Sequence, residues 1–142
     1  MSQISQLVAF AKADTTNDDK EINFGIVPNY LAQQINQFGK VKVNGGEKVL
    51  TTYGVSHIFK EHGEGTKQGE RGQKDITPAD LEFIPLIFRE PDEIQEGKKN
   101  RRGHESFKLL KKINGFTYCI IVSLIHKKGN LKLHVDTMFA KK

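Results

Sequence analysis

The chain contains little of several residue types that would point to a particular chemistry. Its 142 residues include one cysteine, Cys119, and no tryptophan. A single cysteine excludes a disulfide within the chain and a cluster of thiolates around a metal ion. Because Cys119 lies in the apolar run YCIIVSLI, we expect it to be a small buried side chain and not a reactive thiol.

Long apolar runs are absent as well. No stretch approaches the roughly 18 apolar residues that a membrane-spanning helix requires. The run MSQISQLVAFAKADTT at the start of the sequence lacks the positive residues and the cleavage site of a secretory signal. We therefore expect a protein of the reducing cytoplasm, unless it is a piece of something delivered elsewhere.

Aromatic and acidic residues are both scarce. Aromatic side chains make up 8% of the chain and mostly fall on apolar stripes, unlike the exposed aromatics of proteins that stack single-stranded nucleic acid. Between Lys98 and Lys142 the acids are Glu105 and Asp136. The whole chain has 22 Lys and Arg against 17 Asp and Glu, a net charge of +5. A basic C-terminal part favours a polyanionic partner such as RNA or DNA.

The composition fits one folded domain. Hydrophobic residues make up 37% and charged residues 27% of the chain, which is ordinary for a globular protein and too apolar for disorder. The length fits a single domain over residues 1–142. Within it we distinguish an N-terminal helical or extended region, residues 1–50, from a core, residues 51–142.

Hydrophobic periodicity predicts helices first and strands afterwards. Apolar spacing and helix-start signals predict helices over residues 3–12, 28–38, 52–62 and from 77 to before Pro91. Alternating patterns predict strands over residues 40–44, 47–51, 92–97, 104–112, 115–126 and 130–139. The first two should form a hairpin at Gly45-Gly46, and the turn dipeptides Asn114-Gly115 and Gly129-Asn130 should join the last three. This order indicates an α+β domain.

The last predicted strand, residues 130–139, has two different faces. Its apolar face includes Leu131 and Thr137, and its polar face includes His134 and Asp136. One face should therefore pack on the core while the other does not.

Two histidines, His57 and His62, lie on the predicted helix 52–62. A spacing of five residues places them about 140° apart around a helix, whereas helical zinc pairs need a spacing of four, so we expect no metal and no cofactor. A lone histidine here would be a surface or capping residue. These two instead lie beside Lys60 and before a glycine-rich basic loop, GEGTKQGERGQKD, which contains Arg71.

Imidazole titrates near neutral pH and suits proton transfer to and from a ribose hydroxyl. Metal-independent RNA cleavage needs a base for the 2′-hydroxyl, an acid for the leaving 5′-oxygen, and cations or donors at the phosphate. Histidines, lysines and a hydroxyl on a strand can supply all three. The candidate substrate-binding residues, chosen for their charge, are Lys60, Arg71, Arg101, His104 and Lys108.

The order of these motifs resembles a known family. The run SHIFKEHG, the glycine-rich loop, the run ITPADLEFIPLIFREPDEI and the strands ending in VDTMF are similar to those of phage-associated nucleases grouped with barnase, EndoU, colicin RNases and RelE. The resemblance covers about residues 50–140. It implies N-terminal helices packed on a four-stranded antiparallel sheet and metal-independent ribonuclease activity, often in phage head-morphogenesis proteins or polymorphic toxins.

The resemblance also implies catalytic roles for the helix histidines and for a Ser or Thr on the last strand. These correspond to His57, His62 and Thr137, with His104 or His134 as the alternative second proton-transfer group. RNA is the implied substrate, and a toxin would have an acidic immunity protein as partner. Two other functions stay open: an RNA- or protein-binding module without catalysis, and an assembly component of a phage particle.

Overall fold

The computed structural model describes residues 2–13, 20–38, 42–66, 72–100, 102–127 and 129–142. The helices in these ranges are α1 (Gln3–Ala13), α2 (Asn29–Asn36), α3 (Thr52–His62), α4 (Pro78–Leu81) and α5 (Ile84–Arg89). The strands are β1 (Glu21–Ile26), β2 (Glu47–Thr51), β3 (Gln73–Lys74), β4 (Glu93–Glu96), β5 (Ser106–Ile113), β6 (Phe116–Lys127) and β7 (Asn130–Lys141).

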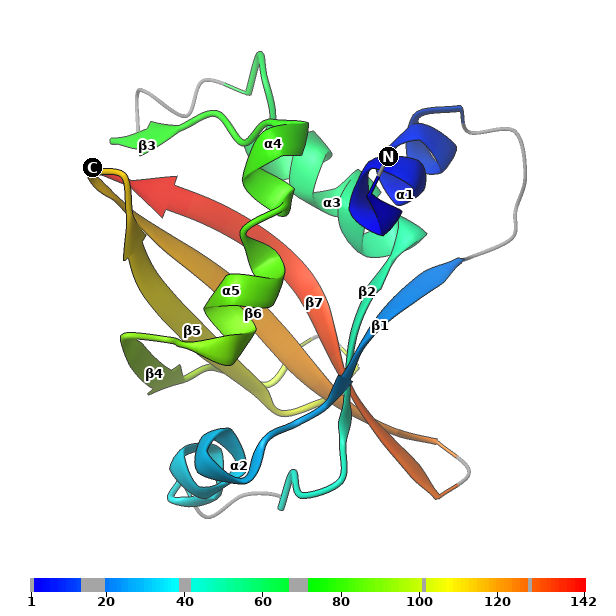
Figure 1. The fold of residues 1–142 in the computed structure, drawn as a ribbon, viewed down its shortest axis with the longest axis vertical. Helices are drawn as coiled ribbons and strands as arrows, with labels where there is room; N and C mark the ends of the chain where they lie inside the picture. The colour runs from blue at the N-terminus through cyan, green and yellow to red at the C-terminus, as the bar shows by residue number, and fades with distance from the viewer. Residues whose placement is uncertain (1, 14–19, 39–41, 67–71, 101, 128) are drawn as a thin grey trace.

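The strands form one mixed sheet in the order β1-β2-β7-β6-β5-β4, and β3 pairs with the far end of β7 (Figure 1). The antiparallel meander β4–β7 is the one that the sequence predicts. However, β2 runs parallel to β7, and β1 pairs with β2. The α+β class is therefore confirmed, and the expectation of a four-stranded antiparallel sheet is wrong. Three helices separate β2 from β7, and such a long connection permits parallel pairing.

The predicted hairpin over residues 40–51 does not form. Residues 42–44 are not part of a strand, and residues 39–41 lie outside the described part of the chain. Asn36, the last residue of α2, accepts the backbone N–H of Val43 at 2.9 Å. This bond links the connection to α2, and β2 pairs with β1 and β7.

The helix predicted from Thr77 starts as expected and is then interrupted. The Asp80 carboxylate accepts the backbone N–H of Thr77 at 2.8 Å, which caps the first turn. Helix α4 ends at Leu81 and α5 begins at Ile84. The break has a simple cause, because Pro85 lacks the N–H that would bond to the Leu81 carbonyl.

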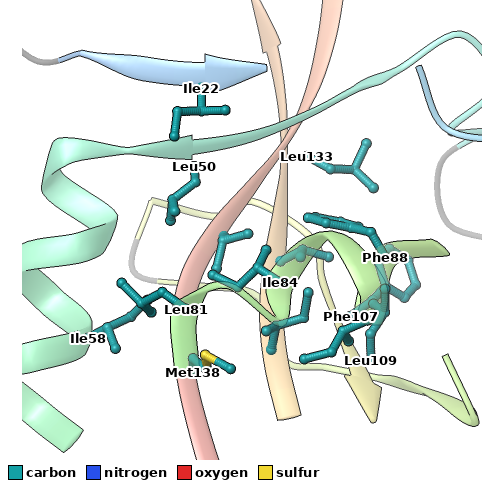
Figure 2. Packing of buried hydrophobic residues seen from close by; sticks show 14 of the residues in the cluster. Ile22, Leu50, Ile58, Leu81, Ile84, Phe88, Phe107, Leu109, Leu133 and Met138 are labelled. Atoms are coloured by element: carbon teal, nitrogen blue, oxygen red, sulfur yellow. The ribbon is translucent and has the colours of Figure 1, made fainter. Parts of the chain in front are cut away.

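Helices α4 and α5 cover one face of the sheet, and the hydrophobic core lies between them and the strands (Figures 1 and 2). Ile84 and Phe88 of α5 are fully buried in one cluster with Phe107 and Leu109 of β5. Burying each such side chain stabilises the fold by about 1.5–3 kcal/mol. Among the described residues, no helix has the length and apolar character needed to cross a membrane.

The opposite face of the sheet, which we call the outer face, carries residues in rows set by the strand register. Side chains directly paired across antiparallel strands share a face. One row consists of Ser106, Ser123 and His134, and the next consists of Lys108, Ile121 and Thr137.

Strand β7 contains a bulge at Asp136. Val135 and Thr137 pair with two consecutive residues of β6, so Asp136 is an extra residue in β7. An extra residue shifts the later side chains to the other face. Thr137 therefore lies on the outer face, and Met138 is fully buried. The prediction that Thr137 belongs to the apolar face is wrong, because the regular alternation ends at Val135.

Candidate functional site

Asp136 lies at the centre of a polar cluster on the outer face. Its carboxylate accepts a hydrogen bond from the hydroxyl of Ser123, a fully buried residue of β6. Burial raises the pKa of Asp136, while the Ser123 bond and the charges of His134, His57 and His104 act in the opposite direction. A half-buried carboxylate therefore lies within electrostatic reach of three imidazoles.

The three histidines come from separate elements. His57 projects from α3, and His134 lies on β7 directly across from Ser123. His104 belongs to the loop between β4 and β5. All three rings are half-buried. A helix, a strand and a loop thus bring imidazoles to one carboxylate, and no local spacing in the sequence could indicate this.

Asn100 organises the loop that carries His104. Its side-chain oxygen accepts the backbone N–H groups of Arg102 and His104, each at 2.9 Å. Its side-chain amide donates to the Ser123 hydroxyl at 3.2 Å. Because a serine hydroxyl has one proton, Ser123 accepts from Asn100 and donates to Asp136. The loop is thereby connected to the carboxylate through a fixed direction of hydrogen bonding.

Helix α3 lies along a part of the β7 edge that no strand among the described residues covers. The pairing with β2 extends to His134, and the pairing with β3 begins at Ala140. Between them the helix approaches the strand backbone closely: a Cβ added at Gly54 would lie 2.6 Å from the Val135 carbonyl oxygen. Only a glycine permits this contact, which places α3 and its histidines beside the bulge.

The two histidines of α3 lie along the same part of β7. The charge of His57 acts on Asp136, and the ring of His62 lies 5.6 Å from that of Phe139. At 1.5 Å per residue, the two are separated by about 7.5 Å along the helix axis. Thr137 lies between Asp136 and Phe139 in the strand. The structure therefore brings the three residues of the predicted catalytic set to one region.

Thr137 has a distinctive environment. Its hydroxyl oxygen is buried and has no hydrogen-bond partner among the described residues. Lys108, in the same row, is half-buried and lies two strands away, roughly 10 Å between Cα atoms at the usual strand spacing. A buried hydroxyl without a partner among the described residues, on the same sheet face as a cation, is an arrangement that an anionic ligand can satisfy.

The other predicted binding residues are placed as follows. Lys60 is exposed on α3. His104 belongs to the Asp136 cluster, and Arg71 and Arg101 lie outside the described residues. No three His, Cys, Asp or Glu side chains in the described ranges are arranged to hold a metal ion.

The prediction for Cys119 is confirmed, since the thiol is 2% exposed. Burial raises its pKa to about 11, and the charges of Lys108 and Lys141 act against that rise. The thiol therefore stays protonated near neutral pH, and a thiolate nucleophile is not available at this position.

The sequence interpretation missed Asp136, Ser123 and Asn100 as members of the site. One signal was present for Asp136, because it and Glu105 are the two acids in an otherwise basic stretch that ends at Lys142. Ser123 and Asn100 carried none, since serine in an apolar strand and asparagine in a loop are common.

Comparison with known proteins gives one family. Residues 25–142 match the family described as phage-Barnase-EndoU-ColicinE5/D-RelE like nuclease3. Neither the curated proteins nor the solved structures contain a match to the chain. The matched region includes α3, the β4–β7 meander and the whole Asp136 cluster. The chain therefore belongs to this family of phage-associated nuclease-like proteins, as the resemblance of its motifs indicates.

Proposed function

We propose that the protein is a metal-independent endoribonuclease, acting as a toxin or phage effector. The observation that supports this proposal is the Asp136 carboxylate surrounded by imidazoles on a basic sheet face, next to the unsatisfied Thr137 hydroxyl. Membership of the nuclease family supports cleavage of nucleic acid, and the histidines support the chemistry that uses the ribose 2′-hydroxyl.

The proposed reaction is a transesterification. A base removes the proton of the 2′-hydroxyl while that oxygen attacks the adjacent phosphorus, and a new P–O2′ bond forms. The P–O5′ bond breaks, and an acid donates a proton to the leaving 5′-oxygen. The products are a 2′,3′-cyclic phosphate and a 5′-hydroxyl, and two groups that titrate near neutrality are sufficient.

We assign the base to His57. Its neighbour Asp136 can accept a hydrogen bond from the imidazole and stabilise the imidazolium that forms when the ring takes the proton, as a carboxylate does in other imidazole-based sites. Ser123 and, behind it, Asn100 hold that carboxylate in place. The nearby charges of His134 and His104 favour the ionised form of Asp136, against the effect of burial.

We assign the acid to His62 and phosphate binding to Thr137 and Lys108. The two histidines are about 7.5 Å apart along the helix axis and about 140° apart around it, so they would reach one phosphate from its two sides, each imidazole about 3 Å from an oxygen. The buried Thr137 hydroxyl would then donate to a phosphate oxygen, and Lys108 and Lys60 would supply positive charge. His134 is the alternative acid, because it also lies beside Asp136.

The test uses purified protein and RNA in the presence of EDTA. We expect cleavage, products with 2′,3′-cyclic phosphate ends, and no cleavage of the DNA of the same sequence, which lacks the 2′-hydroxyl. Replacing the base, His57→Ala, should lower the rate by about 10²–10⁴-fold. His126→Ala is the matched control, since His126 is exposed on β6 at the distant β6–β7 turn, and its rate should equal that of the wild type.

Several results would contradict the proposal. A requirement for a divalent cation would refute metal independence, and full activity of His57→Ala would remove the helix histidine from the mechanism. RNA binding without turnover would favour the alternative function, a binding module without catalysis. The variants His62→Ala and His134→Ala decide which ring is the acid. With an RNA whose leaving group needs no proton, replacing the acid should lower the cleavage rate less than it does with ordinary RNA. Replacing the other ring should lower both rates equally.

The basic outer face also suits an acidic protein partner, and we infer that an immunity protein would bind there and cover the Asp136 cluster. A cell that produces the wild-type protein alone should stop growing, whereas production of His57→Ala should be tolerated. Equal growth in both cases would argue against a toxin.

A further inference from the structure

Tyr53 is an aromatic side chain that the proposed reaction does not use. It lies in the first turn of α3 and is 71% exposed, the highest value among the large hydrophobic side chains that the structure describes. Its ring stacks nearly parallel to that of His57, with 6.3 Å between the ring centroids and 19° between the planes. The most exposed aromatic ring therefore adjoins the imidazole that we assign as the base.

Little of the Tyr53 ring is buried against the rest of the protein. A ring that is 71% exposed contributes little to the core, and a stacked pair at i and i+4 adds only slightly to helix stability. Its backbone, however, is held firmly. The Thr51 hydroxyl caps the helix by accepting the N–H of Gly54 at 3.0 Å, and Gly54 packs against the β7 backbone. The ring is thus presented to solvent from a rigid element.

We propose that Tyr53 is the stacking platform of a nucleobase subsite, which takes the base of a nucleotide next to the cleaved phosphodiester. This inference rests on the proposed function. A ribose held with its 2′-hydroxyl at His57 brings its own base, or the neighbouring one, to the Tyr53 ring, where it extends the His57–Tyr53 stack. Stacking uses the flat face that every base has, so the subsite requires a base without selecting its identity.

The subsite has a consequence for the substrate class. A base in a duplex is already stacked between its neighbours and cannot lie flat on Tyr53 without being unpaired. Bases in single strands and loops are free to do so. The protein should therefore bind unpaired RNA and discriminate against the same sequence in a duplex.

The experiment measures binding of a short single-stranded RNA whose 2′-hydroxyls are methylated, so that no cleavage occurs. Tyr53→Ala should weaken binding by about tenfold, equivalent to about 1.4 kcal/mol, whereas Tyr53→Phe should bind like the wild type because it keeps the ring. Tyr30→Ala is the matched control: Tyr30 is 47% exposed on α2, which lies at the other end of the molecule from α3 in Figure 1.

A second arm identifies the base that stacks. One position at a time in the RNA is made abasic, and each RNA is tested with the wild type and with Tyr53→Ala. At the position whose base stacks on Tyr53, the abasic change and Tyr53→Ala should together weaken binding no more than either does alone, because each removes the same contact. With an unmodified RNA, saturated Tyr53→Ala should cleave at a rate within about threefold of the wild type and keep the same pH profile.

Three results would overturn the inference. They are unchanged affinity in Tyr53→Ala, additive effects at every abasic position, and a lower saturated rate with an altered pH profile, which would mean that Tyr53 positions His57 instead. In all three the wild type still cleaves RNA, so the proposed function survives. A wild-type protein that neither binds nor cleaves RNA would overturn both.

Discussion

The hydrogen bond between Ser123 and Asp136 offers a sharp test of the site. Ser123→Ala removes the hydroxyl that donates to the carboxylate and accepts from Asn100. Ser123 itself has no solvent access, since it is 0% exposed, whereas Asp136 and Asn100 are half-buried. A hydrogen bond to a charged group stabilises a protein by about 1.5–3 kcal/mol, so we expect a loss of about that size at pH 7.

The loss should depend on pH. Burial raises the pKa of Asp136, and the Ser123 bond opposes that rise. When a carboxyl has a higher pKa in the folded than in the unfolded state, its stabilising contribution is present below the unfolded pKa and is lost as the pH rises through the folded pKa. Ser123→Ala raises the folded pKa further. The free energy of unfolding should therefore fall more steeply with pH in the variant.

Urea unfolding at pH 7 and near pH 4 measures this difference. Ser106→Ala is the matched control, because Ser106 pairs directly with Ser123, is 4% exposed, and donates to the neutral Lys98 carbonyl. It should cost about 0.5–1.5 kcal/mol at both pH values. An equal loss for Ser123→Ala at the two pH values, or a larger loss at acid pH, would refute the assignment of Asp136 as a carboxylate held by Ser123.

Two further predictions follow from buried polar groups. Thr137→Val removes the hydroxyl that has no partner among the described residues, so the free energy of unfolding should stay equal or rise by about 1 kcal/mol. The rate of RNA cleavage should fall by at least about tenfold. A destabilised or fully active variant would contradict the phosphate-binding role. Burial alone would raise the pKa of Asp80, but bonds from Lys74, Thr77 and Tyr118 hold it below its usual value. Its stabilising effect is therefore present above the unfolded pKa and is lost as the pH falls through the folded pKa. Asp80→Asn should lower the free energy of unfolding by about 2–4 kcal/mol at pH 7. In urea unfolding at a series of pH values, the variant should also lack the decrease in stability that Asp80 causes at acid pH. The same decrease in the variant as in the wild type would contradict the prediction.

Local patterns predict much of the fold. Alternation and the Asn114-Gly115 turn predict the meander, and both turn residues have the positive φ, 52° and 84°, that such a hairpin needs. The N-cap at Thr77 marks the start of α4. The parallel pairing of β2 with β7 was not predictable, because it joins segments that are distant in the chain and carries no local signal. Pro85 was a signal for the interrupted helix, but its effect depends on the packing of both halves.

For the candidate site as well, local patterns predict one part and long-range contacts determine the rest. His57 and His62 are recognisable because they share a short helix with the positive charge of Lys60. The role of Asp136 depends on the bulge, and alternation alone does not show where a strand holds an extra residue. Ser123 and Asn100 become relevant only when three strands and a loop are assembled. Sequence patterns thus predict the groups that do chemistry more readily than the groups that hold them.

Because of the bulge in β7, the proposed chemistry depends on how side chains alternate along that strand. Before Asp136 the odd-numbered residues are buried, as Val135 is, and after it the even-numbered ones are, as Met138 is. Between the buried residues Val135 and Met138, a regular strand has room for one outward side chain, whereas the bulge has room for two, Asp136 and Thr137. Deleting one of these two residues would leave Val135 and Met138 buried but would remove either the carboxylate or the hydroxyl from the outer face. A shortened β7 should therefore fold with its core intact and lose the proposed activity.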